Sequence, residues 1–166
     1  MTLGRAVYRT RQFAAYTLGG WGKVDDASAV AALPPPLAAL FRSMDAAARR
    51  HHLAVYRRLR ARGCDTPEVL AAALLHDIGK GRVSPLERTA YVLASRVGPW
   101  LVRRLAGDGR RGWRALYRLA HHPAIGAALV QAAGGSERVV WLIANHQRRD
   151  VRDRDLQLLR EADEAS

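Results

Sequence analysis

The chain has 166 residues, of which 49% are hydrophobic and 25% charged, and its formal net charge is +12. This length suits one globular domain with a single core, and this balance excludes an intrinsically disordered protein. Because the basic residues are nearly all arginines and no nucleic-acid-binding signature accompanies them, we do not assign nucleic acid as the main partner.

Helices are predicted along almost the whole chain, because apolar residues recur at steps of three and four and no alternation of period two persists. The predicted fold class is therefore all-α. In the N-terminal part, short helices are predicted near residues 7–17, after residues 25–26 and after the three prolines at 34–36. We interpret residues 1–43 as a helical extension that packs on a core domain formed by residues 44–166.

The predicted centre of the domain is a helix with almost no polar face. It follows a long helix over residues 45–62 that ends at Gly63. The central helix begins with Thr66 as its N-cap, and Gly79 is expected to end it in a left-handed conformation. Since its residues are mainly alanine, leucine and valine, we expect it to be buried on all sides.

The rest of the chain is predicted to form further helices around this centre. An amphipathic region from Pro85 to about Leu105 is interrupted at Gly98-Pro99, and residues 107–112 form a loop. The remaining helices are predicted over residues 113–121, from Pro123 to Ala133, after the N-cap Ser136, and over residues 155–163.

Several of these helices direct ionisable side chains at the predicted core. On the helix over residues 45–62, His51 lies within the apolar stripe and His52 lies at its edge. His146 and Asp163 continue the apolar faces of the last two helices. The polar residues of these faces therefore need partners inside the core.

Two further positions carry histidines. The doublet His76-Asp77 stands at the end of the central helix. His121 continues the apolar stripe of its helix, whereas His122 precedes Pro123 and is expected to leave helical geometry. Geometry alone leaves the choice between these two histidines open.

Four helices direct a histidine or an aspartate at the same core, although the chain has only six histidines in all. This joint pattern predicts a metal site. Imidazoles with two carboxylates suit Mn, Fe, Co, Ni or Zn better than Mg or Ca, which prefer oxygen ligands. The single cysteine, Cys64, excludes a thiolate-rich zinc site and an internal disulfide. Two metal ions about 3.5–4 Å apart, bridged by a carboxylate and a water, would use all these ligands, and this arrangement recurs in phosphoester hydrolysis.

The ordered motifs resemble those of the HD-domain (HDIG-type) metal-dependent phosphohydrolases. They are LLHDIGK at 74–80, a histidine about one helix upstream, HPAIG at 122–126, the histidine of IANHQ and the aspartate of READEA. The resemblance spans residues 44–163. It implies an all-α HD-domain helical bundle, with ligands converging from several helices and a short N-terminal helical extension.

Carried over residue by residue, the resemblance implies one or two divalent transition-metal ions held by His51, His76, Asp77, His122, His146 and Asp163. Asp77 would bridge the two metals, and Lys80 would reach a substrate phosphate, so these two are the expected catalytic residues. The resemblance prefers His51 to His52, because a valine follows four residues later. It prefers His122 to His121, because Pro-Ala-Ile-Gly follows.

The expected partner is a small anionic phosphorylated substrate, and the family implies a nucleotide. Lys80, together with Arg82, Arg148 and Arg149, is expected to bind or steer it. A GYP-containing loop does not follow His146, which argues against cyclic di-GMP. Specificity is expected from residues 82–112; their alternative role is a basic amphipathic face on a membrane surface, but we expect core packing.

The leading interpretation is a cytoplasmic HD-type hydrolase without a transmembrane segment, and its oligomeric state is not assigned. An alternative is a regulatory sensor domain that binds metal and nucleotide without turnover, which Asn145 and the missing loop favour. A third is a basic nucleic-acid-binding helical protein whose inward histidines are structural.

Overall fold

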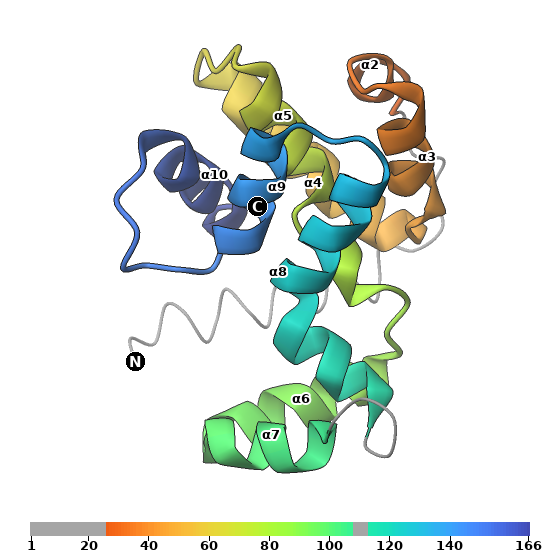
Figure 1. The fold of residues 1–166 in the computed structure, drawn as a ribbon, viewed down its shortest axis with the longest axis vertical. Helices are drawn as coiled ribbons and strands as arrows, with labels where there is room; N and C mark the ends of the chain where they lie inside the picture. Colours follow the sequence, from red (N-terminus) through yellow and green to blue (C-terminus); the bar gives the residue numbers. More distant parts are fainter. Residues whose placement is uncertain (1–25, 108–112) are drawn as a thin grey trace.

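The computed structural model describes residues 26–107 and 113–166, which contain helices and no strand (Figure 1). This confirms the all-α fold class. The predicted helix near residues 7–17 and most of the predicted loop at 107–112 lie outside the described residues. The helices are α2 (Ala27–Ala31), α3 (Pro35–Ser43), α4 (Ala46–Ala61), α5 (Pro67–Leu75), the short 3₁₀ helix η1 (Ile78–Lys80), α6 (Pro85–Val97), α7 (Pro99–Ala106), α8 (Arg114–Ala132), α9 (Glu137–Asn145) and α10 (Arg154–Glu164).

Helix α5 is the centre of the core, as its composition predicts. Most of its side chains are buried, and α3, α4, α9 and α10 pack around it. The side chains of Leu74 and Leu75 are wholly inaccessible to solvent. From the N-terminal part, α3 buries Leu37 and Phe41 in the same core. No helix among the described residues is both long and apolar enough to cross a bilayer.

Helices α6 and α7 form a hairpin at one end of the molecule (Figure 1, bottom). They pack against each other and against α8, whose other contacts are with η1 and α9. We expected core packing for this segment, but only small or medium side chains such as Ala94, Val102 and Ala106 are buried. Its larger apolar side chains are exposed, because no other described element covers the outer face of the hairpin.

The central helix ends earlier than predicted, at Leu75 rather than at Gly79. Gly79 does not have a positive φ; the left-handed turn falls at Gly81, whose φ is +60°. The reason for a glycine at 79 is a close approach to α8. A Cβ atom there would lie 2.1 Å from the carbonyl oxygen of His122 and 2.6 Å from the amide nitrogen of Gly126.

The sequence predicted that a new helix begins at Pro123, but this residue lies inside the continuous helix α8. A proline in a helix interior leaves the carbonyl four residues earlier without its usual amide donor. That carbonyl belongs to Leu119, and it accepts a hydrogen bond from the ring Nδ1 of His122 at 2.8 Å. The expectation that His122 leaves helical geometry is therefore wrong as well.

Candidate metal centre

The structure brings all six predicted ligand residues together around the C-terminal end of α5. His51 lies on α4, and His76 and Asp77 form the junction between α5 and η1. The other three residues come from three further helices: His122 is on α8, His146 caps the C-terminus of α9, and Asp163 is on α10. Five separate segments thus contribute to one cluster.

One half of the cluster joins α4, α5 and α10. Asp163 Oδ1 lies 3.0 Å from His51 Nε2 and 3.5 Å from His76 Nε2. Asp77 Oδ2 is 3.8 Å from His76 Nε2. Ligand atoms from His51, His76 and Asp77 lie close enough together for one metal ion to contact all three.

The other half of the cluster uses the second carboxylate oxygen of Asp77. Asp77 Oδ1 lies 3.2 Å from His122 Nε2 and 3.5 Å from His146 Nε2. These three residues form a second group whose ligand atoms lie within 4.8 Å of one another. Asp77 therefore stands between two histidine-containing groups and turns one oxygen to each.

Three of the histidines are held in the same way by the backbone. His76, His122 and His146 each direct ring Nδ1 at the carbonyl oxygen three residues earlier, at 3.1, 2.8 and 2.7 Å. A carbonyl oxygen only accepts, so Nδ1 carries the proton in each of them. In the neutral ring Nε2 then bears the lone pair, which is the form that binds metals.

The donor set fits a cation better than it fits internal hydrogen bonding. His122 Nε2 and His146 Nε2 face each other at 3.3 Å, although their Nδ1 bonds leave both as acceptors in the neutral rings. The buried Nε2 of His76 has no hydrogen-bond partner among the described residues. The side-chain amide of Gln147 can donate to the lone pair of His122, but a metal ion satisfies all the lone pairs that converge here, and mixed imidazole and carboxylate ligands suit a transition metal.

Both aspartates of the cluster are ionised at neutral pH. Burial alone would raise the pKa of Asp77, but Lys80 and the surrounding histidines outweigh it and hold that pKa well below its usual range. Burial opposes ionisation of Asp163 too, yet His76 and His51 lower its pKa. The two carboxylates raise the pKa of His76 against the effect of its own burial.

The four predicted substrate-binding residues lie in different surroundings. The ammonium group of Lys80 pairs with Asp77 Oδ2, so it borders the cluster. Arg82 is exposed, and its carbonyl accepts a hydrogen bond from Arg118. Arg148 and Arg149 follow His146 in the sequence and are exposed. Arg148 pairs with the carboxylate of Asp150, and Arg149 pairs with that of Glu164. Their roles in substrate binding stay predictions.

The two histidines that the resemblance disfavours belong to neither group of candidate metal ligands. His121 is exposed, and its ring packs on Tyr117 at 4.4 Å between centroids. His52 is buried with its ring edge-on to His76 at 4.6 Å, and neither of its nitrogens has a hydrogen-bond partner among the described residues. Burial and the neighbouring His76 lower the pKa of His52 well below its usual range, so it is neutral.

Gln147 is a neighbour of the cluster that the sequence analysis did not identify. Its side-chain amide nitrogen donates to His122 Nε2 at 3.2 Å. Its position directly after His146 is the one signal that could have indicated it. Because the side chain is long, flexible and at an exposed position, periodicity gave no direction for it.

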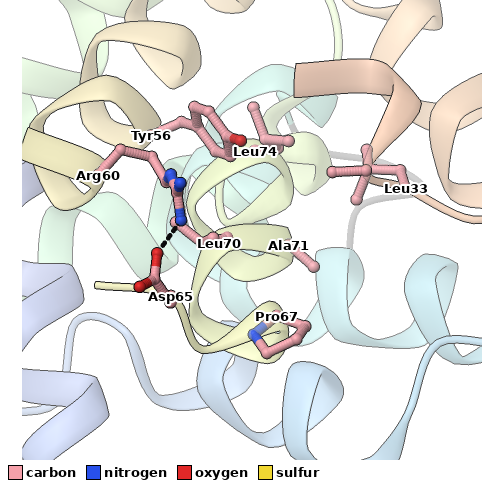
Figure 2. Close-up of a pocket in the computed structure, with 9 residues that line it drawn as sticks. Leu33, Tyr56, Arg60, Asp65, Pro67, Leu70, Ala71 and Leu74 are labelled. Atoms are coloured by element: carbon pink, nitrogen blue, oxygen red, sulfur yellow. Dashed lines mark hydrogen bonds and ion pairs between the residues drawn. The ribbon is translucent and has the colours of Figure 1, made fainter. Parts of the chain in front are cut away.

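A cavity of about 350 Å³ lies elsewhere, between α2, α4 and α5 (Figure 2). An ion pair between Arg60 and Asp65 lies in its wall. The lining contains no histidine: it is formed by Ala32, Leu33, Tyr56, Arg60, Asp65, Pro67, Leu70, Ala71 and Leu74. This cavity is therefore separate from the candidate metal centre.

Comparison with protein family models identifies the family to which the chain belongs. The family model of the HD domain matches residues 48–166, which include every residue of the cluster. Comparisons with curated proteins and with solved structures gave no significant match. The match covers well over half of the chain, and the chain belongs to the HD domain family.

Proposed function

We propose that the protein is a metal-dependent phosphohydrolase that cleaves a phosphoester or phosphoanhydride bond in a small nucleotide-like substrate. The observation that carries the proposal is the position of Asp77 between two histidine-containing groups, one oxygen toward each. A carboxylate shared in this way is the usual bridge of two-metal centres that act on phosphate esters. Membership of the HD domain family supports the same reaction class.

In this proposal, His51, His76 and Asp163 would hold a first divalent ion, His122 and His146 would hold a second, and Asp77 would serve both. Two such ions, of Mn, Fe, Co, Ni or Zn, would when bound lower the pKa of a water between them and neutralise the oxygens of a phosphate. The surrounding protein fixes the donor atoms beforehand. The three Nδ1 bonds to backbone carbonyls hold the Nε2 atoms forward, so little order has to be gained on binding.

Lys80 is proposed to bind the substrate phosphate. Its ammonium group is partly exposed and already lies against Asp77, at the border of the cluster. A phosphate that approaches this border can accept a hydrogen bond from the ammonium while its other oxygens face the metal side. Arg82, which is exposed and two residues after Lys80, would add positive charge near the same substrate phosphate.

The proposal is tested with protein purified without a nickel column. Its metal content is measured by mass spectrometry, and phosphate release is followed from a panel of nucleotides with Mn²⁺. We expect Asp77→Asn to lose activity by about three orders of magnitude or more, because the variant lacks the shared charge. Asp65→Asn, an exposed aspartate that pairs with Arg60 outside the cluster, is the matched control and should keep activity.

Each other outcome has a distinct meaning. Equal release by the wild type and Asp77→Asn would show a contaminating enzyme, and the catalytic proposal would fail. Stoichiometric metal with tight nucleotide binding but no turnover would identify the sensor instead. The sensor has some support from Asn145, whose amide donates to the carbonyl of Trp141 and is therefore used outside the cluster.

A further inference from the structure

Exposed apolar side chains are concentrated on one part of the molecule. Of the seven large hydrophobic side chains that are exposed among the described residues, six belong to α6, α7 and the residue that precedes α8. Leu86 is 74% exposed, Val97 61% and Trp100 56%. We call this set the α6–α7 patch: Leu86, Leu93, Val97, Trp100, Leu105 and Trp113. Contiguous exposed apolar surface of this kind marks an interaction site more often than a free surface.

The members of the patch all lie on the hairpin or at the start of α8. Leu86, Leu93 and Val97 are separated by seven and four residues, which places them on one face of α6. The ring of Trp100 folds back on the junction between the helices, where its Cδ1 lies 2.9 Å from the position of a Cβ on Gly98. The amide of Trp113 donates to the carbonyl oxygen of Leu105 at 2.9 Å, so these two residues adjoin at the other end of α7.

The patch is accompanied by positive charge. The described residues between 82 and 118 include seven arginines and a single acidic residue, Glu87. Glu87 is used within the capping box of α6, where it accepts hydrogen bonds from Ser84. Among the described residues, no carboxylate pairs with the exposed guanidinium groups of Arg96, Arg103, Arg104 and Arg114.

From this combination we propose that the α6–α7 hairpin docks the protein on a membrane surface that contains anionic phospholipids. Aliphatic side chains and tryptophans enter the boundary between headgroups and acyl chains, while arginines stay at the level of the lipid phosphates. The hairpin lies at one end of the molecule, beyond the core around α5 (Figure 1). It can therefore meet a flat surface without displacing any described element. The proposal does not depend on the proposed function.

Charge and chemistry favour this occupant over three others. A second copy of the chain would bring one set of unpaired arginines against another. Residues 1–25 carry four basic residues and one acidic residue, so they have the same sign as the patch. Nucleic acid would pair with the arginines, but it would leave Leu86, Leu93 and Val97 without apolar contacts. An anionic bilayer offers phosphates to the arginines and acyl chains to the apolar side chains.

The test is co-sedimentation of the full chain with vesicles of phosphatidylcholine, either alone or mixed with phosphatidylglycerol. We expect binding to the mixed vesicles that weakens as salt is raised, and little binding to phosphatidylcholine alone. The double variants Leu93→Ser with Val97→Ser and Arg103→Glu with Arg104→Glu should each lower the partition coefficient by at least about tenfold. Leu129→Ser is the matched control, because Leu129 is the one exposed large apolar residue outside the patch in the part of the chain that the structure describes.

A second measurement uses the unmodified protein, so that it does not depend on how the variants fold. Phospholipids brominated on their acyl chains should quench the tryptophan fluorescence of the wild-type protein. In a separate comparison, Trp100→Phe should show less of that quenching. Circular dichroism confirms that each variant is folded before its binding is compared. Unquenched fluorescence in the presence of mixed vesicles would overturn the proposal.

Several results would replace membrane docking with another explanation. Absence of vesicle binding by the wild type, or equal loss of binding in Leu129→Ser, would overturn it. A dimer that dissociates on Leu93→Ser with Val97→Ser, measured by analytical ultracentrifugation without lipid, would assign the patch to a second copy. Retention of an oligonucleotide that is lost with Arg103→Glu and Arg104→Glu, without vesicle binding, would assign it to nucleic acid.

Discussion

The ring of His122 donates from Nδ1 to the carbonyl oxygen of Leu119, 2.8 Å away, and this is the carbonyl that Pro123 leaves without an amide donor. In Pro123→Ala a backbone amide would compete for it. We expect the affinity for the metal ion held by His122 and His146 to fall by up to about tenfold, because the ring loses part of its support.

Although Pro123→Ala should weaken metal binding, it should not lower the stability of the fold. Alanine restores a backbone hydrogen bond inside α8, so the free energy of unfolding in urea should be unchanged or higher. Calorimetric titration with Mn²⁺ measures the affinity. Pro99→Ala, at the first turn of α7, is the control and should leave it unchanged. Unaltered affinity in Pro123→Ala would show that the proline has no part in holding His122.

Positions 79 and 63 require glycine for different reasons, and alanine substitutions should have different effects on stability at the two positions. In Gly79→Ala the added Cβ overlaps backbone atoms of α8, so η1 and α8 must move apart. We expect a loss of about 3 kcal/mol or more in the free energy of unfolding, together with weaker metal binding, since Asp77 would draw away from His122.

Gly63 has a positive φ and open space around its Cβ position. Gly63→Ala should therefore cost only about 1 kcal/mol, which is the strain of a left-handed residue, and should leave metal binding intact. Urea denaturation of the metal-free proteins gives both values. Similar losses in the two variants would contradict the close approach of η1 to α8.

The two halves of the cluster predict the metal content of single variants. His51→Gln should lose one ion and keep the second, His122→Gln should do the reverse, and Asp77→Asn should weaken both. The expected drop in affinity is at least about a hundredfold where a direct ligand is lost. Metal-to-protein ratios after dialysis provide the measurement.

His121→Gln controls for the removal of an exposed imidazole and should keep the full content. A single ion per chain that disappears in His51→Gln and also in His122→Gln would replace the two-metal arrangement by one mixed site. The same variants would then report on that site.

His52 should make the metal-free protein less stable in mild acid. Burial lowers its pKa in the folded state well below its usual value, so the unfolded chain takes up a proton below about pH 6.5 and the folded chain does not. Because the unfolded state then binds more protons, stability falls as pH falls. Between pH 7.5 and pH 5.5 this contribution amounts to about 1 kcal/mol.

His52→Leu removes that contribution and also the two unpartnered ring nitrogens. Its stability should equal or exceed that of the wild type at pH 7.5, and the difference should grow toward pH 5.5. His121→Leu is the control for an exposed histidine. A constant difference between wild type and His52→Leu over this range would show that the ring takes up a proton as readily in the folded protein as in the unfolded chain.

The clustering of these histidines and aspartates could be predicted from the sequence because a buried helical face brings all its residues to the core. His51, His146 and Asp163 each continue an apolar stripe, and the structure places them in one cluster. The apolar sequence of α5 likewise indicated the centre of the fold.

Helix ends and partners were less predictable, since they depend on contacts between distant segments. Gly79 resembled a terminator, but its contact is with α8. Pro123 resembled a helix start, but the ring of His122 compensates for its missing amide. Arg149, in the loop between α9 and α10, pairs with Glu164 of α10, and the exposure of Trp100 follows from the absence of a described element over α7.

His51 and Asp163 stand near opposite ends of the matched domain, yet their side chains meet at 3.0 Å. A cation bound there would act as a cross-link that closes most of the domain into a loop, and long loops gain the most from closure. Its geometry exists only after α4, α5 and α10 have come together, so metal capture would belong to a late stage of folding. For the same reason, detachment of α10 should release the ion before the rest of the domain unfolds.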